Sequence, residues 1–141
     1  MVRRLKAVQK HPPVMRTIRG LPNGAVIPAV GNSGAKKLQL ISVIGYKPSR
    51  RRYPAAAIGD MIVASVVKGN PDMRKKVVRA IIVQMKQKIR RADGTYLHFE
   101  GNGAVVVDED GNPKGTEIKG PVAREAINRW PGLGKVASMV V

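Results

Sequence analysis

The chain has 141 residues, of which 26 are lysine or arginine and 9 are aspartate or glutamate, so its formal net charge is +17. That length suits one domain, and a protein so far from neutrality needs a polyanion to neutralise it, with nucleic acid favoured over an anionic membrane. The lack of cysteine excludes disulfides and thiolate metal sites. Because the sequence also lacks both a bilayer-spanning apolar run and a secretory signal, it predicts a cytoplasmic protein.

The charge is divided unevenly along the chain. Up to Ala92 there are 21 basic and 2 acidic residues, whereas from Asp93 onward there are 5 basic and 7 acidic residues. Solubilising charge alone would not segregate in this way. We therefore expect the first two-thirds to face a polyanion and the last third to face something else.

The N-terminal part combines a basic extension with two short strands. Residues 1–20 lack a convincing period, so we interpret them as an extension that becomes ordered only on its partner. Residues 25–30 are predicted to form a strand, and Pro28 favours an edge position for it. After a glycine-rich turn, residues 37–44 are predicted to form the next strand.

The middle of the chain alternates loops and strands. Residues 45–57 contain two prolines and three consecutive arginines, which indicates a long loop, and residues 61–67 follow as a strand. From Val77 to Ile89 apolar residues recur with period two, so the pattern predicts a long strand that is buried on both faces near Val77. Asp93-Gly94 favours a hairpin turn, which would leave one long hairpin with a buried root and a basic tip.

The C-terminal third contains a strand, a polar turn and one helix. Residues 104–107 are predicted to be a strand. Pro121 is placed at the start of a helix whose apolar stripe runs from Ala123 to Trp130. Short strands with turns roughly every ten residues favour a mainly β fold, with residues 21–141 as one small β-barrel domain and a helical appendage over about residues 120–137.

Motifs of enzymes and metal sites fit poorly. Residues 132–137 match G-x-G-x-x-A, but no strand precedes them and no βαβ unit has room to follow. Asp108, Asp110 and Asn112 resemble a calcium loop, yet Pro113 stands where that loop needs glycine, so a solvated turn is favoured. Two histidines are too few for an all-histidine zinc site. We expect neither catalysis nor a metal or other cofactor.

Four basic clusters carry the functional prediction, although a single charge run usually marks only a solvated face. Lys36 and Lys37 fit a solvated hairpin end as well as they fit phosphate binding. Tyr53 either stacks on an unpaired base or packs on the barrel. The clusters together favour RNA over DNA, because no recognition helix lies in the basic region. The predicted RNA-binding residues are Asn32, Lys36, Lys37, Lys47, Arg50, Arg51, Arg52, Tyr53, Arg74, Lys75, Lys76, Lys86, Lys88, Arg90 and Arg91.

Four segments also resemble a known family. They are GNSGAKKLQLISV (31–43), GDMIVASVVKGNP (59–71), VVRAIIVQMKQKIRRADGTYLHFEGNGAVVV (77–107) and PKGTEIKGPVARE (113–125). In this order and at these spacings they resemble the universal large-subunit ribosomal protein of the fourteenth family. The N-terminal extension, the long loop before Tyr53 and the ending ASMVV resemble its archaeal form. Gly101 and Gly103 depart from the acidic residue and the alanine usual there, which would loosen the turn before Val105.

The resemblance implies a small closed five-stranded β-barrel with a short C-terminal α-helical segment. It also implies a structural, non-enzymatic role in the large ribosomal subunit, with binding to large-subunit ribosomal RNA at the face that meets the small subunit. The implied partners are small-subunit ribosomal RNA across that interface, neighbouring large-subunit proteins and the sixth initiation factor, which docks near the C-terminal part. The residues we assign to this subunit or protein interface are Arg124, Asn128, Arg129 and Trp130.

Two other classes of protein remain as alternatives. An RNA chaperone or translation factor with a barrel fold would exchange freely and leave ribosomes at moderate salt. An RNA-modifying enzyme would need a cofactor pocket or paired catalytic groups, and the sequence shows neither.

Overall fold

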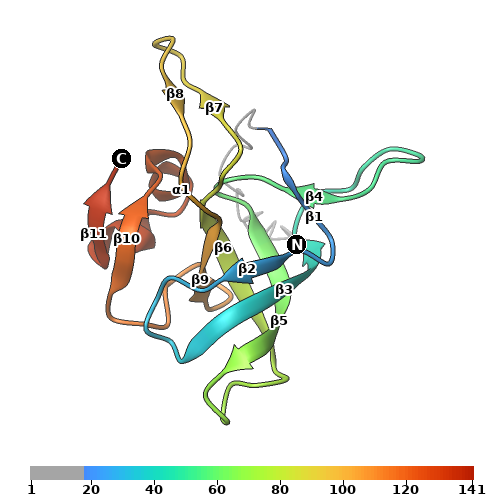
Figure 1. The fold of residues 1–141 in the computed structure, drawn as a ribbon, viewed down its shortest axis with the longest axis vertical. Coiled ribbons are helices and arrows are strands. Elements are labelled where there is room, and N and C mark those ends of the chain that lie inside the picture. The colour runs from blue at the N-terminus through green and yellow to red at the C-terminus, as the bar shows by residue number, and fades with distance from the viewer. Residues whose placement is uncertain (1–17) are drawn as a thin grey trace, which may run out of the picture.

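The fold is built on a five-stranded sheet, which a computed structural model describes within residues 18–141. The strand order is β2-β3-β5-β6-β9, and all neighbours are antiparallel (Figure 1). The strands are β2 (Val26–Pro28), β3 (Ala35–Val43), β5 (Met61–Gly69), β6 (Val77–Gln84) and β9 (Gly103–Val107). The two outer strands meet at one bridge, where the N–H of Val30 donates to the carbonyl of Ala104 at 3.0 Å. The mainly β class with a short helix is confirmed.

The predicted strands at residues 25–30, 37–44, 61–67 and 104–107 correspond to β2, β3, β5 and β9. Pro28 lies in the outer strand β2, as its missing N–H requires. In β3 the buried residues Ala35, Leu38, Leu40 and Val43 are separated by exposed ones, since one face of the strand packs on the core.

The long central hairpin is present but interrupted. β6 pairs with β9, and beyond them β7 (Ile89–Arg90) pairs with β8 (Tyr96–Leu97) as a separate two-stranded ribbon. Between the two ladders the N–H of Phe99 donates to the carbonyl of Met85 at 3.2 Å, so the legs stay together across residues 85–88. The prediction of one uninterrupted strand is therefore wrong, although the two legs do run antiparallel.

Burial along β6 also differs from the prediction. Val77 is 64% exposed, so the doubly buried end expected there is wrong. Residues 80–83 are fully buried instead, because the C-terminal segment covers the outer face of β6 at this point. The N–H of Ala123 donates to the carbonyl of Val83 at 3.1 Å and fixes that cover.

The turn before β9 is well packed. The side-chain oxygen of Asn102 accepts a hydrogen bond from the N–H of Lys86 at 3.0 Å, and all of β9 is buried. A Cβ atom at Gly103 would lie 2.8 Å from Val30 and 2.9 Å from Gln84. Gly103 therefore admits close packing, whereas a Cβ atom at Gly101 would meet nothing within 4 Å, so the expected loosening of the turn stays a prediction.

The C-terminal segment contains more strand than predicted. It runs through β10 (Ile118–Val122), α1 (Arg124–Arg129), the 3-10 helix η1 (Pro131–Lys135) and β11 (Ala137–Val140). Pro121 lies in β10, so the helix start predicted there is wrong. The N–H of Val141 bonds to the carbonyl of Val122 and β10 runs parallel to β11, which makes the appendage a small helix-strand layer.

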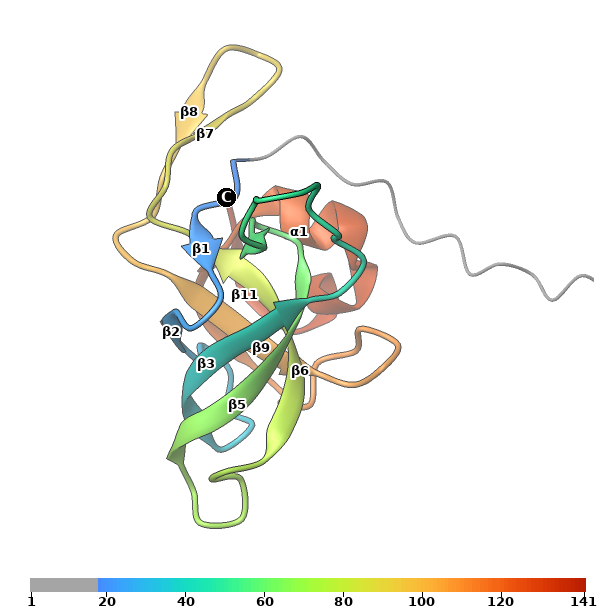
Figure 2. The same ribbon diagram turned by 90° about the vertical axis from the view of Figure 1, so that its right-hand side faces the viewer.

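Three loops extend from the sheet in different directions. The β7–β8 ribbon and the turn between β5 and β6 lie at opposite ends of the long axis, and the loop of residues 45–54 projects sideways (Figures 1 and 2). The latter loop ends in β4 (Ala55–Ala56), which pairs with β1 (Leu21–Pro22). The predicted extension of residues 1–20 lies outside the described residues up to residue 17, but Arg19 already contacts the fold.

Candidate nucleic-acid interface

Six cations gather at the end of the sheet formed by β3 and the β5–β6 turn. The register places Lys37 opposite Lys68, and the N–H of Asn70 donates to the carbonyl of Gly34 at 2.9 Å, which joins the turn to β3. Lys75 adopts φ 63°, a left-handed conformation unusual outside glycine. We call this group the β5–β6 cluster. All its members are exposed, and all but Lys68 were in the predicted set; they are Lys36, Lys37, Lys68, Arg74, Lys75 and Lys76.

The loop of residues 45–54 carries the second group, which we call the Arg50 loop. Lys47, the arginines at 50–52 and Tyr53 are all exposed. Tyr53 is 91% exposed, so the alternative that it packs on the barrel is wrong and its ring is available for stacking. The carbonyl of Ser49 accepts from the N–H of Arg52 at 3.2 Å, and Arg51 has φ 65°, so a tight turn presents the arginines.

The β7–β8 ribbon carries the third group. Lys86, Lys88 and Arg90 are exposed at its base and along its leg. Asp93 closes the tip by accepting hydrogen bonds from the Thr95 hydroxyl (2.7 Å) and N–H (3.0 Å), and these contacts lower the pKa of Asp93. They stabilise the turn above the ordinary pKa of aspartate and are lost as the pH falls through the lowered value.

Arg91 differs from the other cations of the ribbon because its guanidinium is engaged inside the molecule. It donates to Glu125 at 2.8 and 3.3 Å and to the carbonyl oxygen of Val141 at 2.6 Å. The hydrogen bond to Glu125 is the main cause of a raised pKa for Arg91. This side chain ties the ribbon to α1 and to Val141, and its contact with RNA stays a prediction.

Replacing Arg91 with glutamine is expected to loosen the base of the ribbon. The ion pair with Glu125 is only partly exposed, so a double-mutant cycle with Glu125→Gln should give a coupling free energy of about 1 kcal/mol. Amide hydrogen exchange should rise in β7 and β8 and stay unchanged in β5. Additive losses of stability in the cycle would contradict the contact.

Asn32 is likewise held by internal contacts. Its amide nitrogen donates to the Thr116 hydroxyl at 2.8 Å, and its oxygen accepts from the N–H of Thr116 at 2.8 Å. The side chain thus pins the loop before β10 to the loop before β3. Its contact with RNA stays a prediction beside this structural role.

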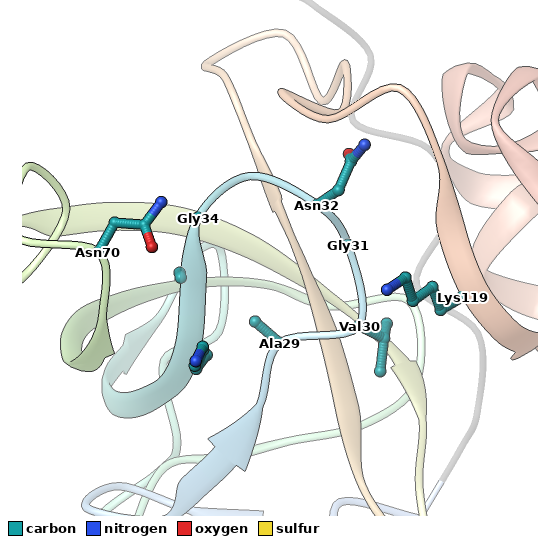
Figure 3. Close-up of a pocket in the computed structure, with 9 residues that line it drawn as sticks. Ala29, Val30, Gly31, Asn32, Gly34, Asn70 and Lys119 are labelled. Carbon is teal, nitrogen blue, oxygen red and sulfur yellow. The ribbon is translucent and has the colours of Figure 1, made fainter.

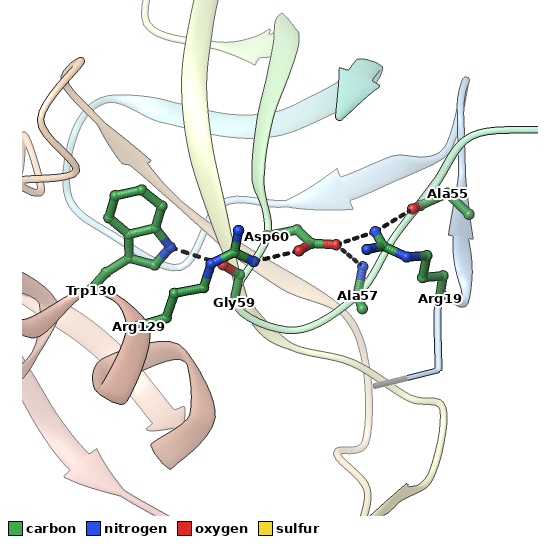
Figure 4. A network of polar contacts seen from close by, with 7 residues as sticks. All are labelled: Arg19, Ala55, Ala57, Gly59, Asp60, Arg129 and Trp130. Atoms are coloured by element: carbon green, nitrogen blue, oxygen red, sulfur yellow. Dashed lines mark hydrogen bonds and ion pairs between the residues drawn. The ribbon is translucent and has the colours of Figure 1, made fainter. Parts of the chain in front are cut away.

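A buried carboxylate that was not predicted connects both ends of the described chain. Asp60 is 4% exposed and lies at the start of β5 (Figure 4). Its two oxygens accept from Arg19 (2.7 Å) and Arg129 (2.6 Å), and the N–H of Ala57 adds a third bond at 2.9 Å. Arg19 also lies 3.7 Å from the ring centre of Tyr46 at the root of the Arg50 loop. The feature of the sequence that could have pointed to Asp60 is its isolation, since it is one of only two acidic residues before Asp93.

The predicted interface residues divide into two kinds. Arg124 and Asn128 are exposed on α1. Arg129 reaches inward to Asp60, and the indole N–H of Trp130 donates to the carbonyl of Gly59 at 2.8 Å. The Trp130 ring also covers Gly111, where a Cβ would lie only 2.5 Å from it. Arg129 and Trp130 therefore hold the C-terminal layer on the sheet, and their assignment to an interface stays a prediction.

Substituting Trp130 with phenylalanine is expected to destabilise the fold by about 1–2 kcal/mol, because the carbonyl of Gly59 loses its hydrogen-bond donor. Thermal unfolding should show the loss. Tyr53→Phe is a suitable control, since that ring is exposed and its melting temperature should match the wild type. A Trp130 variant as stable as the wild type would mean that the indole does not support the layer.

The described part of the chain offers few other sites. His98 is exposed, and within residues 18–141 no three histidine or acidic side chains come together to hold a metal ion. None of the helices in that range is long and apolar enough to cross a membrane. Its ion pairs involve Arg19, Arg79, Arg91 and Arg129, so the cations of the β5–β6 cluster and the Arg50 loop have no carboxylate partner there.

Comparison with known proteins shows the family of this chain. Residues 20–141 match the model of the family described as ribosomal protein L14p/L23e. A protein named large ribosomal subunit protein uL14 from Picrophilus torridus is 53% identical over 126 residues, which cover 89% of this chain and 96% of the relative. Its namesake from Methanococcus maripaludis is 50% identical over 123 residues, covering 87% and 93%. The chain belongs to the ribosomal protein L14p/L23e family.

Proposed function

We propose that this protein is a structural constituent of the large ribosomal subunit that binds its ribosomal RNA. The observation that carries the proposal is the set of exposed cations without carboxylate partners in the β5–β6 cluster and the Arg50 loop. As a ribosomal protein it is structural rather than enzymatic, and it works in the cytoplasmic ribosome.

Binding would proceed through phosphate contacts. Lysine and arginine side chains displace counterions from RNA, and the sheet holds them in a fixed arrangement. Tyr53 adds a stacking surface at the tip of the Arg50 loop. The proposed RNA-binding residues are Lys36, Lys37, Lys47, Arg50, Arg51, Arg52, Tyr53, Lys68, Arg74, Lys75, Lys76, Lys86, Lys88 and Arg90.

We further propose that the sheet is closed into a five-stranded barrel and that residues 21–141 form one domain. The bridge between Ala29 and Ala104 joins β2 to β9, which supports closure. A single apolar cluster includes residues from Leu21 to Leu133, which supports one folding unit. A rigid scaffold of this kind keeps the cationic loops in place before RNA binds.

The C-terminal layer is proposed to face the small subunit and other proteins, contributing to intersubunit bridges. Arg124 and Asn128 are exposed on α1, and Met139 and Val140 are exposed on β11. An apolar strand beside exposed polar residues suits protein contacts better than phosphate contacts. The partners implied by the family are small-subunit ribosomal RNA, neighbouring large-subunit proteins and the sixth initiation factor.

A salt titration tests the RNA-binding proposal. Purified protein and large-subunit ribosomal RNA of an archaeal relative should bind with a dissociation constant that rises steeply with salt. Since the β5–β6 cluster alone presents six cations, the slope of log affinity against log salt should be about −4 or steeper. Affinity that is independent of salt would contradict phosphate recognition.

A further inference from the structure

A hollow lies beside the β5–β6 cluster and is formed by three segments distant in the sequence. Its volume is about 470 Å³, within the roughly 300–1,000 Å³ of small-ligand sites. Residues 29–36 supply one side, Asn70 comes from the β5–β6 turn, and Lys119 comes from β10 (Figure 3). Sequence spacing gives no hint that these segments meet.

The lining combines three chemical characters. Ala29, Val30 and Ala35 give a small apolar surface, Asn32 and Asn70 give amides, and Lys36 and Lys119 give ammonium groups. No carboxylate is among the residues that line the hollow. An apolar surface suits the face of a nucleobase, an amide can both donate to and accept from a base edge, and ammonium groups suit phosphate.

The walls of the hollow are fixed by contacts within the protein. The carbonyl of Val30 accepts from the N–H of Lys119 at 2.8 Å, and the carbonyl of Lys36 accepts from the N–H of Ala29 at 3.0 Å. Gly34 has φ +93°, and a Cβ there would lie 3.0 Å from the amide nitrogen of Asn70. The glycine therefore lets the Asn70 amide lie against β3, so the site is formed before any ligand arrives.

We propose that this hollow receives one unpaired nucleotide of large-subunit ribosomal RNA, with its base against Ala29 and Val30 and its phosphate on Lys36 and Lys119. The inference rests on the proposed function, because the flanking phosphates would continue onto Lys37 and Lys68 of the β5–β6 cluster. The lining contains no aromatic ring for stacking. The Asn32 amide also lines the hollow but already bonds Thr116, so discrimination between bases falls to the Asn70 amide.

Filling the hollow without removing a charge separates this proposal from general phosphate binding. The Ala29 side chain faces the hollow in Figure 3, so Ala29→Leu should occupy it while keeping every cation. We expect affinity for large-subunit ribosomal RNA to fall about tenfold at each salt concentration, with the salt slope unchanged. The matched control Lys37→Gln, outside the hollow, should instead make the slope shallower by about 0.7–0.9.

Chemical probing of the bound RNA provides the second readout. Wild-type protein should protect one unpaired nucleotide that Ala29→Leu leaves reactive, while the other protections persist. If Ala29→Leu lowers the melting temperature, Asn70→Ala replaces it, since Asn70 is exposed and its backbone bonds remain. A folded variant with wild-type affinity and the wild-type protection pattern would overturn the nucleotide site alone. If the wild-type protein showed no salt-dependent binding to the RNA, the proposed function would be overturned instead.

Discussion

Replacing Asp60 with asparagine is expected to lower the free energy of unfolding by about 3–5 kcal/mol, the largest stability effect that the structure predicts. The substitution leaves two guanidinium groups, those of Arg19 and Arg129, facing each other around a neutral amide in a buried site. It would also weaken the attachment of the C-terminal layer, because Arg129 belongs to α1. Denaturant unfolding of the full chain measures the loss.

The matched control is Asp72→Asn, which changes the other acid of the basic region at an exposed position. Its effect should stay within about 0.5 kcal/mol. The combination of Asp60→Asn with Arg129→Gln should cost less than the sum of the two single changes, since both remove the same ion pair. If Asp60→Asn proved as stable as Asp72→Asn, the carboxylate could not be the link that holds Arg19 and Arg129 together.

Changing Arg50, Arg51 and Arg52 together to alanine is expected to give the largest effect on RNA binding. Loss of three phosphate contacts should make the salt slope shallower by about 2–3 and reduce incorporation into large subunits. The fold should persist because these side chains are exposed. Alanine and arginine both carry a Cβ atom, so the left-handed backbone at position 51 should cost about the same in the variant as in the wild type. Competition between tagged variant and wild type in assembling subunits measures the defect.

The control for the triple change removes charge elsewhere. Lys114 and Lys135 are exposed in the C-terminal third, and their replacement by alanine should leave the salt slope and the occupancy unchanged. Equal occupancy of salt-washed large subunits by the triple variant and the wild type would show that the Arg50 loop does not contact RNA.

Much of the sheet was predictable because its strands follow period two and end at glycine or proline turns. β3 and β5 were predicted to within two residues at each end on this basis. The break between β6 and β7 was not, since residues 85–88 contain no glycine or proline and the alternation continues through them. That break follows from pairing with distant β9, which no local pattern reports.

The candidate site was predictable where charge stands alone and unpredictable where it is paired. The lysines and arginines of the β5–β6 cluster and the Arg50 loop are exposed, as runs of like charge require. Arg91 belongs to an equally basic stretch and Arg129 to the C-terminal third, and they meet acids 34 and 69 residues away in the sequence. Only the tertiary fold reveals which cation is neutralised.

Sedimentation of the tagged protein through sucrose gradients in a salt series tests the central claim most directly, namely that a rigid β scaffold holds unpaired cations against large-subunit ribosomal RNA. The account predicts that the protein co-sediments with large subunits, stays bound at moderate salt and dissociates only as high salt screens the phosphates. Its presence mainly in the unbound pool, or its release at moderate salt, would contradict the account and identify an exchanging RNA chaperone instead.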